Sequence, residues 1–307
     1  MRSYQIPFLA LLTGVASIPH EGLTERDESQ SFCGFKVPTD NDAATISRLK
    51  EFDSDYAFSS NQGILEVAEP IVVEMNIHAS LPTDSPDDYA SEEVLEKQFD
   101  VLKTTFAPYG IELTLGTISR ELNDSISNLS GGKYAGNYGQ LSGGPPALED
   151  YWKRTRTGGY KSAHLYVYHQ IDDGFIGISS FPELERPESD FWLDSVHLLA
   201  LTLPGSTSTI WNQGKAAIHE FGHWFGLWHV FRNGCLPGDG DMVDDTPAQV
   251  DNHYGECPTD ADSCPSLEGL DTPWNYMSYG GDACFTGFTD GQVTRVHNMF
   301  HNIREVV

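Results

Sequence analysis

The segment HEFGHWFGLWH, residues 219–229, brings three histidines and one glutamate into a single short stretch of the chain. His219 and His223 are four residues apart, so on a helix they lie on one face and can reach the same metal ion. Glu220 lies beside them and can reach a water molecule held by that ion without binding the ion itself. The spacing predicts a helix that carries two metal ligands and a general base.

Gly226 and His229 complete this pattern. Gly226 can adopt the left-handed backbone conformation that ends a helix, and the chain would then turn and present His229 as a third ligand. Three neutral imidazoles leave the fourth coordination position of zinc open to water, as in catalytic rather than structural zinc sites. We therefore predict one Zn2+ per chain, held by His219, His223 and His229, with Glu220 as the base of a hydrolytic reaction. The competing interpretation is a buried amphipathic helix with incidental histidines.

The residues around the motif fit a helix. Asn212 can cap its start, and the apolar residues between 216 and 225 supply a buried face. Gly222 inside a helix costs about 1 kcal/mol relative to alanine, which indicates close packing at that position.

Met277, in the stretch WNYMSY at residues 274–279, follows His229 by 48 residues. Proteases of the metzincin type carry the long histidine motif together with a methionine turn beneath the metal. A lone methionine usually fills a core, but its position after the histidine motif favours a turn of this kind.

Over about residues 195–307 the chain resembles the pappalysin family of secreted metzincins. The likeness is weaker over residues 65–195. It is carried by residues 219–235, 240–248, 275–277, 283–284 and 288–289, and by the helical stretch from Gln292. The resemblance implies an α+β metzincin domain: a twisted mixed sheet, two long helices above a cleft, and an irregular, disulfide-bonded C-terminal part. It also implies endopeptidase activity on protein or peptide substrates.

The N-terminal residues predict export. Arg2 precedes an apolar stretch that is too short for a membrane span and ends in small residues, as in a secretory signal peptide. We expect a signal peptide at 1–17, a pro-segment at 18–60 and a catalytic domain at 61–307, divided near residue 229 into an upper part and a lower part (230–307). The mature protein is expected to be extracellular and monomeric, with no segment that inserts into a membrane.

The composition is strongly acidic, with 45 Asp and Glu against 18 Lys and Arg and a net charge of −27. Such a surface repels nucleic acid and anionic membranes, so we expect neither as a partner. It favours basic substrates or reflects only solubility.

Four of the five cysteines follow the histidine motif. Export permits disulfides, and four cysteines allow three pairings, among which the residues alone do not choose. The resemblance implies Cys235–Cys264 and Cys257–Cys284. A cysteine zinc site is the alternative, but the chain has no Cys-x-x-Cys pair.

Cys33, the fifth cysteine, lies in the expected pro-segment. A soft thiolate binds zinc well, so Cys33 could occupy the open position and keep a precursor latent. Pappalysin-like precursors usually place an arginine two residues before this cysteine, where Ser31 stands here. The alternative is an unpaired or intermolecular cysteine.

Tyr279 and Asp282, which both follow Met277 in the sequence, are further candidate site residues. The resemblance implies that the hydroxyl of Tyr279 stabilises the oxyanion of the reaction, although a tyrosine there could simply pack. It also implies that Asp282 borders the pocket for the residue after the cleaved bond, where an acidic wall would favour Arg or Lys.

Two further kinds of site are predicted from local patterns. Oxygen ligands for Ca2+ could come from Asp239, Asp241, Asp244 and Asp245, unless these residues form a solvated acidic loop. The sequons at Asn123 and Asn128 are candidate glycosylation sites.

Strands and helices interleave before the motif, as a mixed sheet with packed helices requires. We expect strands at 71–77, 111–118, 163–168, 176–181 (an edge strand near the cleft) and 196–203, a helix at 91–106 capped by Ser91, a long loop at 130–146, and a final helix at 290–306. A binding or inhibitory module on a metzincin scaffold is the rival function, but it would need a broken catalytic residue, and none of the motif residues is replaced.

Overall fold

The computed structural model describes residues 32–33, 69–135, 140–184, 186–236 and 240–306. All of them belong to one compact unit, Ser31–Val307. The expected signal peptide and nearly all of the expected pro-segment therefore lie outside the description.

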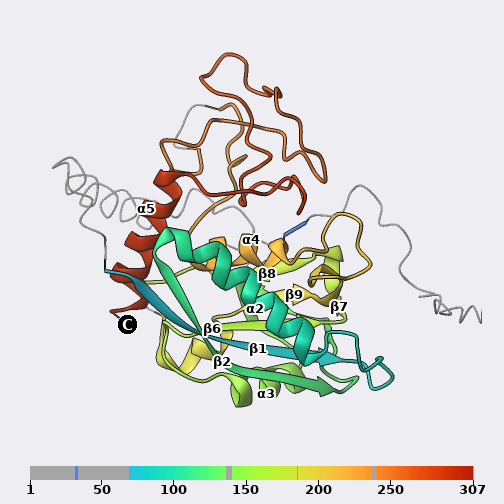
Figure 1. The fold of residues 1–307 in the computed structure, drawn as a ribbon. Coiled ribbons are helices and arrows are strands. Elements are labelled where there is room, and N and C mark those ends of the chain that lie inside the picture. Colours follow the sequence, from blue (N-terminus) through green and yellow to red (C-terminus); the bar gives the residue numbers. More distant parts are fainter. Residues whose placement is uncertain (1–31, 34–68, 136–139, 185, 237–239, 307) are drawn as a thin grey trace, which may run out of the picture. The chain divides into compact units, whose positions relative to one another are not determined.

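A five-stranded mixed sheet organises the fold (Figure 1). Its order is β2-β1-β6-β9-β8, with bounds Ile111–Leu122, Ile71–Leu81, Ala163–Tyr168, Val196–Leu199 and Gly177–Ser179. The first four strands run parallel to one another, and β8 runs antiparallel to β9 at the edge. The predicted mixed sheet and the edge strand near residue 177 are confirmed.

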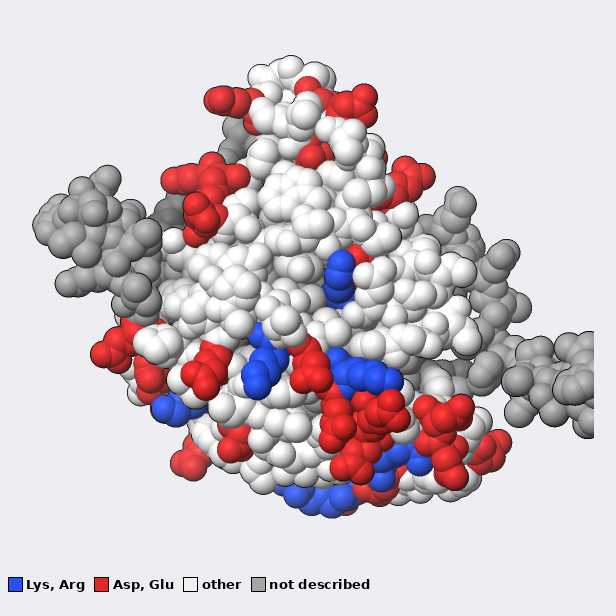
Figure 2. Space-filling view, in the orientation of Figure 1, with Lys and Arg blue, Asp and Glu red and all other residues white. Residues whose placement is uncertain are grey.

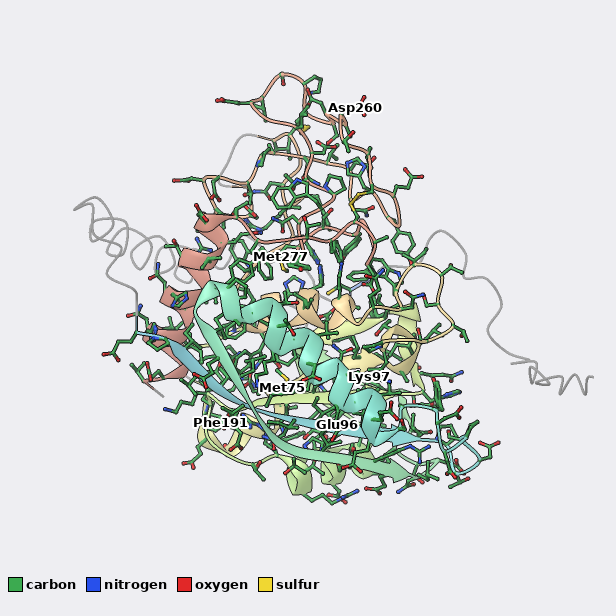
Figure 3. All side chains as sticks on the ribbon, viewed as in Figure 1. Met75, Glu96, Lys97, Phe191, Asp260 and Met277 are labelled. Carbon is green, nitrogen blue, oxygen red and sulfur yellow. A yellow bond between two sulfur atoms is a disulfide. The ribbon has the colours of Figure 1, made fainter. Side chains whose placement is uncertain are left out.

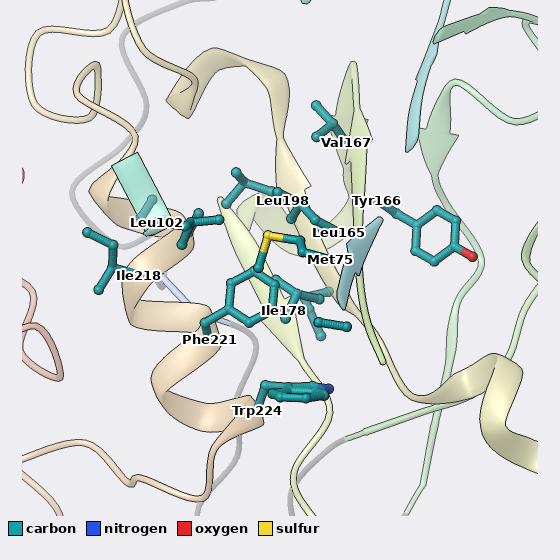
Figure 4. Packing of buried hydrophobic residues seen from close by; sticks show 14 of the residues in the cluster. Met75, Leu102, Leu165, Tyr166, Val167, Ile178, Leu198, Ile218, Phe221 and Trp224 are labelled. Atoms are coloured by element: carbon teal, nitrogen blue, oxygen red, sulfur yellow. The ribbon is translucent and has the colours of Figure 1, made fainter. Parts of the chain in front are cut away.

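Side chains alternate between the two faces of the sheet, because successive strand residues point to opposite sides. Met75, Leu165 and Leu198 lie on the face that Ile218 and Phe221 cover from a layer of two helices (Figure 4). That layer consists of α2 (Glu92–Phe106) and α4 (Lys215–Trp224), which lie on the same side of the sheet (Figure 1). Each fully buried side chain of this size contributes roughly 1.5–3 kcal/mol through removal from water.

The other face of the sheet carries a buried polar and aromatic layer. His78, His164 and His197 stack with Tyr166 along strands β1, β6 and β9. The helix α3 (Pro146–Thr155), which the sequence pattern did not predict, covers this layer with Tyr151 and Trp152, and Tyr151 packs edge-on against Tyr166.

The starts of the two long helices differ. Ser91 caps α2 as predicted, because its side chain accepts the Val94 N–H at 3.3 Å. The prediction that Asn212 caps α4 is wrong. The residue at that position is Gly214, with φ of 78°, while the Asn212 side chain donates to the carbonyl of Ser208 at 2.8 Å within the preceding turn.

Several predicted bounds also change. The expected loop at 130–146 contains two short strands, β4 (Lys133–Ala135) and β5 (Gln140–Gly143), which pair with each other. The strand expected at 196–203 stops at Leu199 and continues as the 3-10 turn η5 (Ala200–Thr202). The final helix α5 (Asp290–Met299) passes into a π-helix, η6 (Phe300–Arg304), rather than reaching 306 as an α-helix. The remaining short elements are η2 (Ala107–Tyr109), η3 (Asp172–Gly174), η4 (Glu188–Leu193), β3 (Asn128–Leu129) and β7 (Gln170–Ile171).

Residues 230–289, here called the loop region, contain no helix or strand among their described residues. Two disulfides cross-link it, Cys235–Cys264 and Cys257–Cys284, which are the pairs that the resemblance implies. They close loops of 29 and 27 residues, and each stabilises the fold by roughly 3–4 kcal/mol if it acts by restricting the unfolded chain. Disulfides thus replace part of the hydrophobic core that this region lacks.

Charges are unevenly distributed on the face shown in Figure 2. Acidic side chains lie around the loop region, and acidic and basic side chains intermingle over the sheet and α2. A band with few charges separates the two areas (Figure 2). No helix within the described ranges is both long and apolar enough to cross a membrane.

Candidate metal centre

The helix α4 carries His219, Glu220 and His223, and all three side chains are fully buried. After the helix, Gly226 adopts a left-handed backbone with φ of 100°. A Cβ at this position would lie 2.6 Å from the side chain of Met299, so the turn has no room for a larger residue. The turn brings His229 back toward the helix, as the sequence predicted.

The three imidazoles converge. Nε2 of His229 lies 3.2 Å from Nε2 of His219 and 3.1 Å from Nε2 of His223. Nδ1 of His219 donates to the carbonyl oxygen of Tyr276 at 2.6 Å, and Nδ1 of His223 donates to that of Leu227 at 2.7 Å. Because these two rings carry their proton on Nδ1, their Nε2 atoms present lone pairs.

This donor set fits a metal ion. Neutral imidazoles with facing lone pairs repel one another unless a cation lies among them. Burial lowers the pKa of His219 to about 3 and the pKa values of His223 and His229 well below 6.5, so the rings stay neutral and able to bind a metal.

Cys33 joins the three histidines. Its sulfur and one nitrogen of each ring lie within 4.8 Å of one another, and all four residues are buried. Among the described residues this is the one group of three or more His, Cys, Asp or Glu side chains arranged to hold a metal ion. Cys33 also forms a parallel β-bridge to Gly177 of β8, so the segment lies along the edge strand.

Glu220 lies against the same edge strand. A Cβ on Gly177 would come within 2.4 Å of Oε1 of Glu220, so only glycine leaves room for this carboxylate. Burial raises the pKa of Glu220 to about 8, and a hydrogen bond from the Cys33 side chain opposes the rise. A carboxyl group whose pKa lies near neutrality can both take up and release a proton in a reaction.

Met277 is fully buried where the loop region meets α4 (Figure 3). A Cβ on Gly222 would lie 2.3 Å from its sulfur, which explains the glycine inside the helix. The side chain of Asn275 accepts the Met277 N–H at 2.9 Å, so the chain makes a tight turn here. The preceding carbonyl, that of Tyr276, is the one that orients His219.

Tyr279 faces the imidazoles. Its hydroxyl oxygen lies 3.2 Å from Nε2 of His229, and its ring packs against His229 with centroids 5.0 Å apart. The hydroxyl therefore lies beside the imidazole nitrogens that could hold a metal ion.

The side chain of Asp282 is fully buried, and its Oδ1 accepts no hydrogen bond from the described residues. Its Oδ2 accepts the Gln213 N–H at 2.5 Å, and Lys215 Nζ donates to its carbonyl oxygen at 2.7 Å. Burial raises the pKa of Asp282 to about 6, opposed by the Gln213 N–H and the Lys215 charge. The carboxylate thus lies beneath the surface, next to a cation.

The three candidate calcium residues that the structure describes are not brought together with one another. Asp239 lies outside the described residues, and Asp241, Asp244 and Asp245 are not among the described side chains arranged to hold an ion. Asp245 accepts from Thr289 Oγ1 at 2.6 Å and from the Gly291 N–H at 2.8 Å, so it ties the loop region to the start of α5.

Asp241 is buried. Its Oδ1 accepts from Thr246 Oγ1 at 2.6 Å, and its Oδ2 accepts no hydrogen bond from the described residues. Burial raises the pKa of Asp241 to about 7.

The two sequon asparagines are both partly exposed, and they follow β2 closely. Asn123 lies at the end of β2 and accepts the Ser125 N–H at 3.0 Å, while Asn128 belongs to β3, which pairs with β7.

Sequence reasoning missed four residues at the site. Phe32 packs against His219, and Trp211 packs against Phe32. Gly177 makes room for Glu220, and Asn252 bonds to the main chain of Tyr279. The pair Phe32–Cys33 was the one available signal, because an apolar residue next to a proposed metal-binding cysteine indicates a segment that packs into a site.

The class that this fold and this arrangement of side chains define is the metzincin type of metalloendopeptidase. Comparisons with known proteins agree. The peptidase family described as pregnancy-associated plasma protein-A matches residues 153–301. An extracellular metalloprotease of Podospora anserina is 38% identical over 241 residues, covering 78% of this chain and 76% of the relative. Extracellular metalloprotease 1 of Coccidioides posadasii is 32% identical over 303 residues, covering 97% of this chain and 98% of the relative. The chain belongs to the pappalysin family of metzincin metalloendopeptidases.

Solved structures show the same fold. Mirolysin in complex with compound 9 matches with a TM-score of 0.58 and 22% identity, covering 76% of this chain and 92% of that one. A mutant of Tannerella forsythia promirolysin matches with a TM-score of 0.60 and 20% identity, covering 88% of this chain and 94% of that one.

Proposed function

We propose that this metalloendopeptidase uses Zn2+ held by His219, His223 and His229, and that Glu220 is its general base. The main observation behind this proposal is that His219 and His223 each donate a hydrogen bond from Nδ1 to a carbonyl oxygen. Their Nε2 atoms therefore face His229, next to the buried carboxylate of Glu220. Bound there, zinc supplies a Lewis acid that acidifies water and polarises a carbonyl.

The chain's own groups perform the proton transfers. Glu220 removes a proton from the attacking water and delivers it to the nitrogen of the leaving amine. Tyr279 donates a hydrogen bond from its hydroxyl to the oxyanion that develops on the scissile carbonyl. Both groups are buried, so electrostatic effects on them are strong.

The test compares purified mature variants in a chelator-sensitive casein assay, with zinc content measured on the same samples. Glu220→Ala is expected to fold and keep one zinc while losing about 100- to 10,000-fold in kcat. Tyr279→Phe is expected to lose about 100-fold. Glu96→Ala, an exposed glutamate on α2 (Figure 3), is the matched control and should retain activity. Wild-type turnover by Glu220→Ala, or a protein without stoichiometric zinc, would contradict the proposal.

We further propose that the protein is made as a latent precursor in which the Cys33 thiolate completes the group of three histidines. The grouping of the four side chains and the bridge to β8 support this, although the family's usual arginine is replaced by Ser31. Cys33→Ala precursor should be more active and process itself faster than wild type. In wild-type precursor the Cys33 thiol should react with a thiol reagent only after chelation, since the other cysteines are in disulfides. Immediate reaction without chelation would favour an intermolecular or unpaired cysteine.

The same proposal includes export. Residues 1–17 would be removed as a signal peptide, residues 18–60 as a pro-segment, and the mature, extracellular chain would begin near residue 61. The relatives' printed names, extracellular metalloproteases, support secretion. N-terminal sequencing of the protein recovered from culture medium tests both cleavage sites, and deglycosylation of Asn123→Gln and Asn128→Gln variants tests the two sequons.

A further inference from the structure

Asn275 and Gln292 form a pair of side-chain amides between the loop region and α5, here called the amide pair. Both residues are fully buried. Nδ2 of Asn275 donates to Oε1 of Gln292 at 2.8 Å, and Nε2 of Gln292 donates to Oδ1 of Asn275 at 3.2 Å. Because buried polar groups need partners, two amides that bond in both directions hold each other in one orientation.

Main-chain N–H groups determine which atom of each amide is the oxygen. Oε1 of Gln292 also accepts the Thr289 N–H at 2.9 Å, and Oδ1 of Asn275 also accepts the Met277 N–H at 2.9 Å. An amide nitrogen at either place would face another donor, so neither amide can turn over without losing its hydrogen bonds. The amide pair therefore has one arrangement, which joins the start of α5 to the turn at Met277 (Figure 3).

The peptide group that joins Tyr276 to Met277 lies between the amide pair and a metal ligand. Its N–H donates to Asn275, and its carbonyl oxygen accepts a hydrogen bond from Nδ1 of His219 at 2.6 Å. In a planar trans peptide group the N–H and the C=O point in opposite directions, so a bond that holds the N–H also aims the carbonyl oxygen. A carbonyl aimed at Nδ1 orients the imidazole ring and leaves its Nε2 for a metal.

Other hydrogen bonds of the turn hold other peptide groups. The Tyr276 N–H donates to the carbonyl oxygen of Gly287 at 3.1 Å, and the Met277 carbonyl oxygen accepts the Val230 N–H at 3.3 Å. Neither bond involves the group between Tyr276 and Met277. Among the described residues, the side chain of Asn275 is the acceptor for the N–H of that group, so its orientation depends on the amide pair.

We propose that Gln292 positions the metal ligand His219 through the Asn275 amide. Gln292 also closes the capping box of α5 with Thr289, so one side chain couples the start of that helix to the metal site. The inference rests on the proposed zinc site, and it adds a residue of α5 that acts on zinc affinity without being a ligand.

Chelator competition on the mature protein measures the zinc Kd of matched variants. Gln292→Met keeps the length of the side chain but removes the amide, and it should raise the zinc Kd about 10- to 100-fold. The control is Gln98→Met, which removes a fully buried glutamine of α2 that donates to the Gly214 carbonyl at 3.0 Å. It should keep the wild-type Kd even where urea unfolding shows an equal loss of stability. Equal Kd values for Gln292→Met and wild type, or equal rises in both variants, overturn the proposal.

A double variant tests the route through Asn275. Asn275→Ala should raise the zinc Kd by a factor similar to that of Gln292→Met. Adding Gln292→Met to Asn275→Ala should cause almost no further rise, because the amide that Gln292 orients is already absent. Effects that multiply in the double variant would overturn the route and leave Gln292 as a residue that supports the fold alone.

The imidazole N–H proton signals of the zinc-loaded mature protein give a second readout by NMR. In Gln292→Met the Nδ1–H signal of His219 should shift and exchange faster with water, because its acceptor is misplaced. The signal of His223, which donates to the Leu227 carbonyl, should keep its position. Shifts of both signals or of neither overturn the proposal. A wild-type protein that binds no zinc contradicts the proposed function instead.

Discussion

The main chain of Tyr279 is bonded to Asn252, whose carbonyl oxygen accepts the Tyr279 N–H at 3.1 Å. Three residues further along the same loop, the Gly255 N–H donates back to the Tyr279 carbonyl at 2.9 Å. The loop is shaped by His253, which has a positive φ of 51° and lies 2.8 Å through Nε2 from Oδ2 of Asp271. The position of the Tyr279 hydroxyl therefore depends on a buried pair that does not touch the metal ligands.

Asp271→Asn should lower kcat about 10-fold with little change in KM, because a misplaced hydroxyl weakens only the transition state. The same substitution in a Tyr279→Phe background should have almost no further effect on kcat, since the hydroxyl is already absent. Asp260→Asn, in the same loop region (Figure 3), serves as the control. Equal losses in the two backgrounds would mean that Asp271 supports the fold rather than Tyr279.

Gly222→Ala should weaken zinc binding about 10-fold or more, measured by competition with a chelator. The added methyl would lie 2.3 Å from the Met277 sulfur, so the turn that carries the Tyr276 carbonyl must move away from His219. Alanine alone would favour the helix by about 1 kcal/mol, so any loss must come from this contact. Gly222→Ala/Met277→Ala should recover affinity, and an unchanged affinity in the single variant would refute the argument.

Asp194→Asn should destabilise the mature protein by roughly 3–5 kcal/mol in urea unfolding. The Asp194 carboxylate is fully buried and accepts from Arg304 at 2.9 and 3.1 Å and from the Trp224 indole at 3.3 Å. Arg304 also donates to the Trp224 carbonyl at 2.9 Å, so the pair ties η6 to the end of the metal-binding helix. Glu93→Gln, which breaks the exposed pair with Lys97, should change stability little, and a similar small change for Asp194→Asn would contradict this prediction.

Acid should destabilise the fold below about pH 6.5. Burial lowers the pKa of His78 to about 4 and that of His197 to about 3, and it lowers the pKa of His164 further, while unfolded histidine titrates near 6.5. The charges of Arg154 and Arg156 add to the shift of His78. Between pH 6.5 and 4 the unfolded chain therefore binds protons that the folded chain does not, and stability falls by up to about 1.4 kcal/mol per pH unit for each histidine.

Urea unfolding at several pH values checks this. His78→Gln should have a shallower slope over pH 6.5–4 than wild type, whatever it costs at pH 8. Gln in place of the partly exposed His301 is the control and should keep the wild-type slope. Identical slopes for all three proteins would show that the buried histidines of the sheet do not cause the loss of stability at low pH.

Removing Ca2+ while keeping Zn2+ should lower the melting temperature if Asp241 takes part in a calcium site. The support is a buried carboxylate whose second oxygen accepts no hydrogen bond from the described residues. Asp241→Asn should then lose the calcium-dependent rise in Tm, whereas Glu268→Gln, an exposed acidic residue elsewhere in the loop region, should keep it. A melting temperature that is indifferent to calcium would reject the site.

The sequence correctly predicted the features that depend on neighbouring residues in the chain. Ser91 caps α2, β6 has its expected bounds, and residues 219–229 form a helix, a glycine turn and a returning histidine, because each depends on neighbours in the chain. The resemblance, not the spacing, supplied the disulfide pairs. The contact of Phe32 with Trp211 was missed because the two residues are far apart in sequence, and α3 was missed because Pro145 and Pro146 disguise its start.

Buried partners explain the remaining differences. The depth of Asp282 was not predicted: its carboxylate accepts the Gln213 N–H, and its carbonyl oxygen accepts a hydrogen bond from Lys215, while its place in a substrate pocket stays a prediction. Gly214 replaces Asn212 at the start of α4 because the Asn212 side chain is used by the preceding turn. Such choices depend on three-dimensional neighbours, which a single sequence does not reveal.

The loop closed by the Cys257–Cys284 disulfide contains both Met277 and Tyr279. An oxidised bond therefore holds together the part of the loop region that contacts the histidines. Where thiols are kept reduced, the zinc-binding helix would lack its support and the proteolytic machinery would be incomplete. If the chain is exported as proposed, the disulfides form only after it leaves the reducing compartment, and the protease does not complete its site before then.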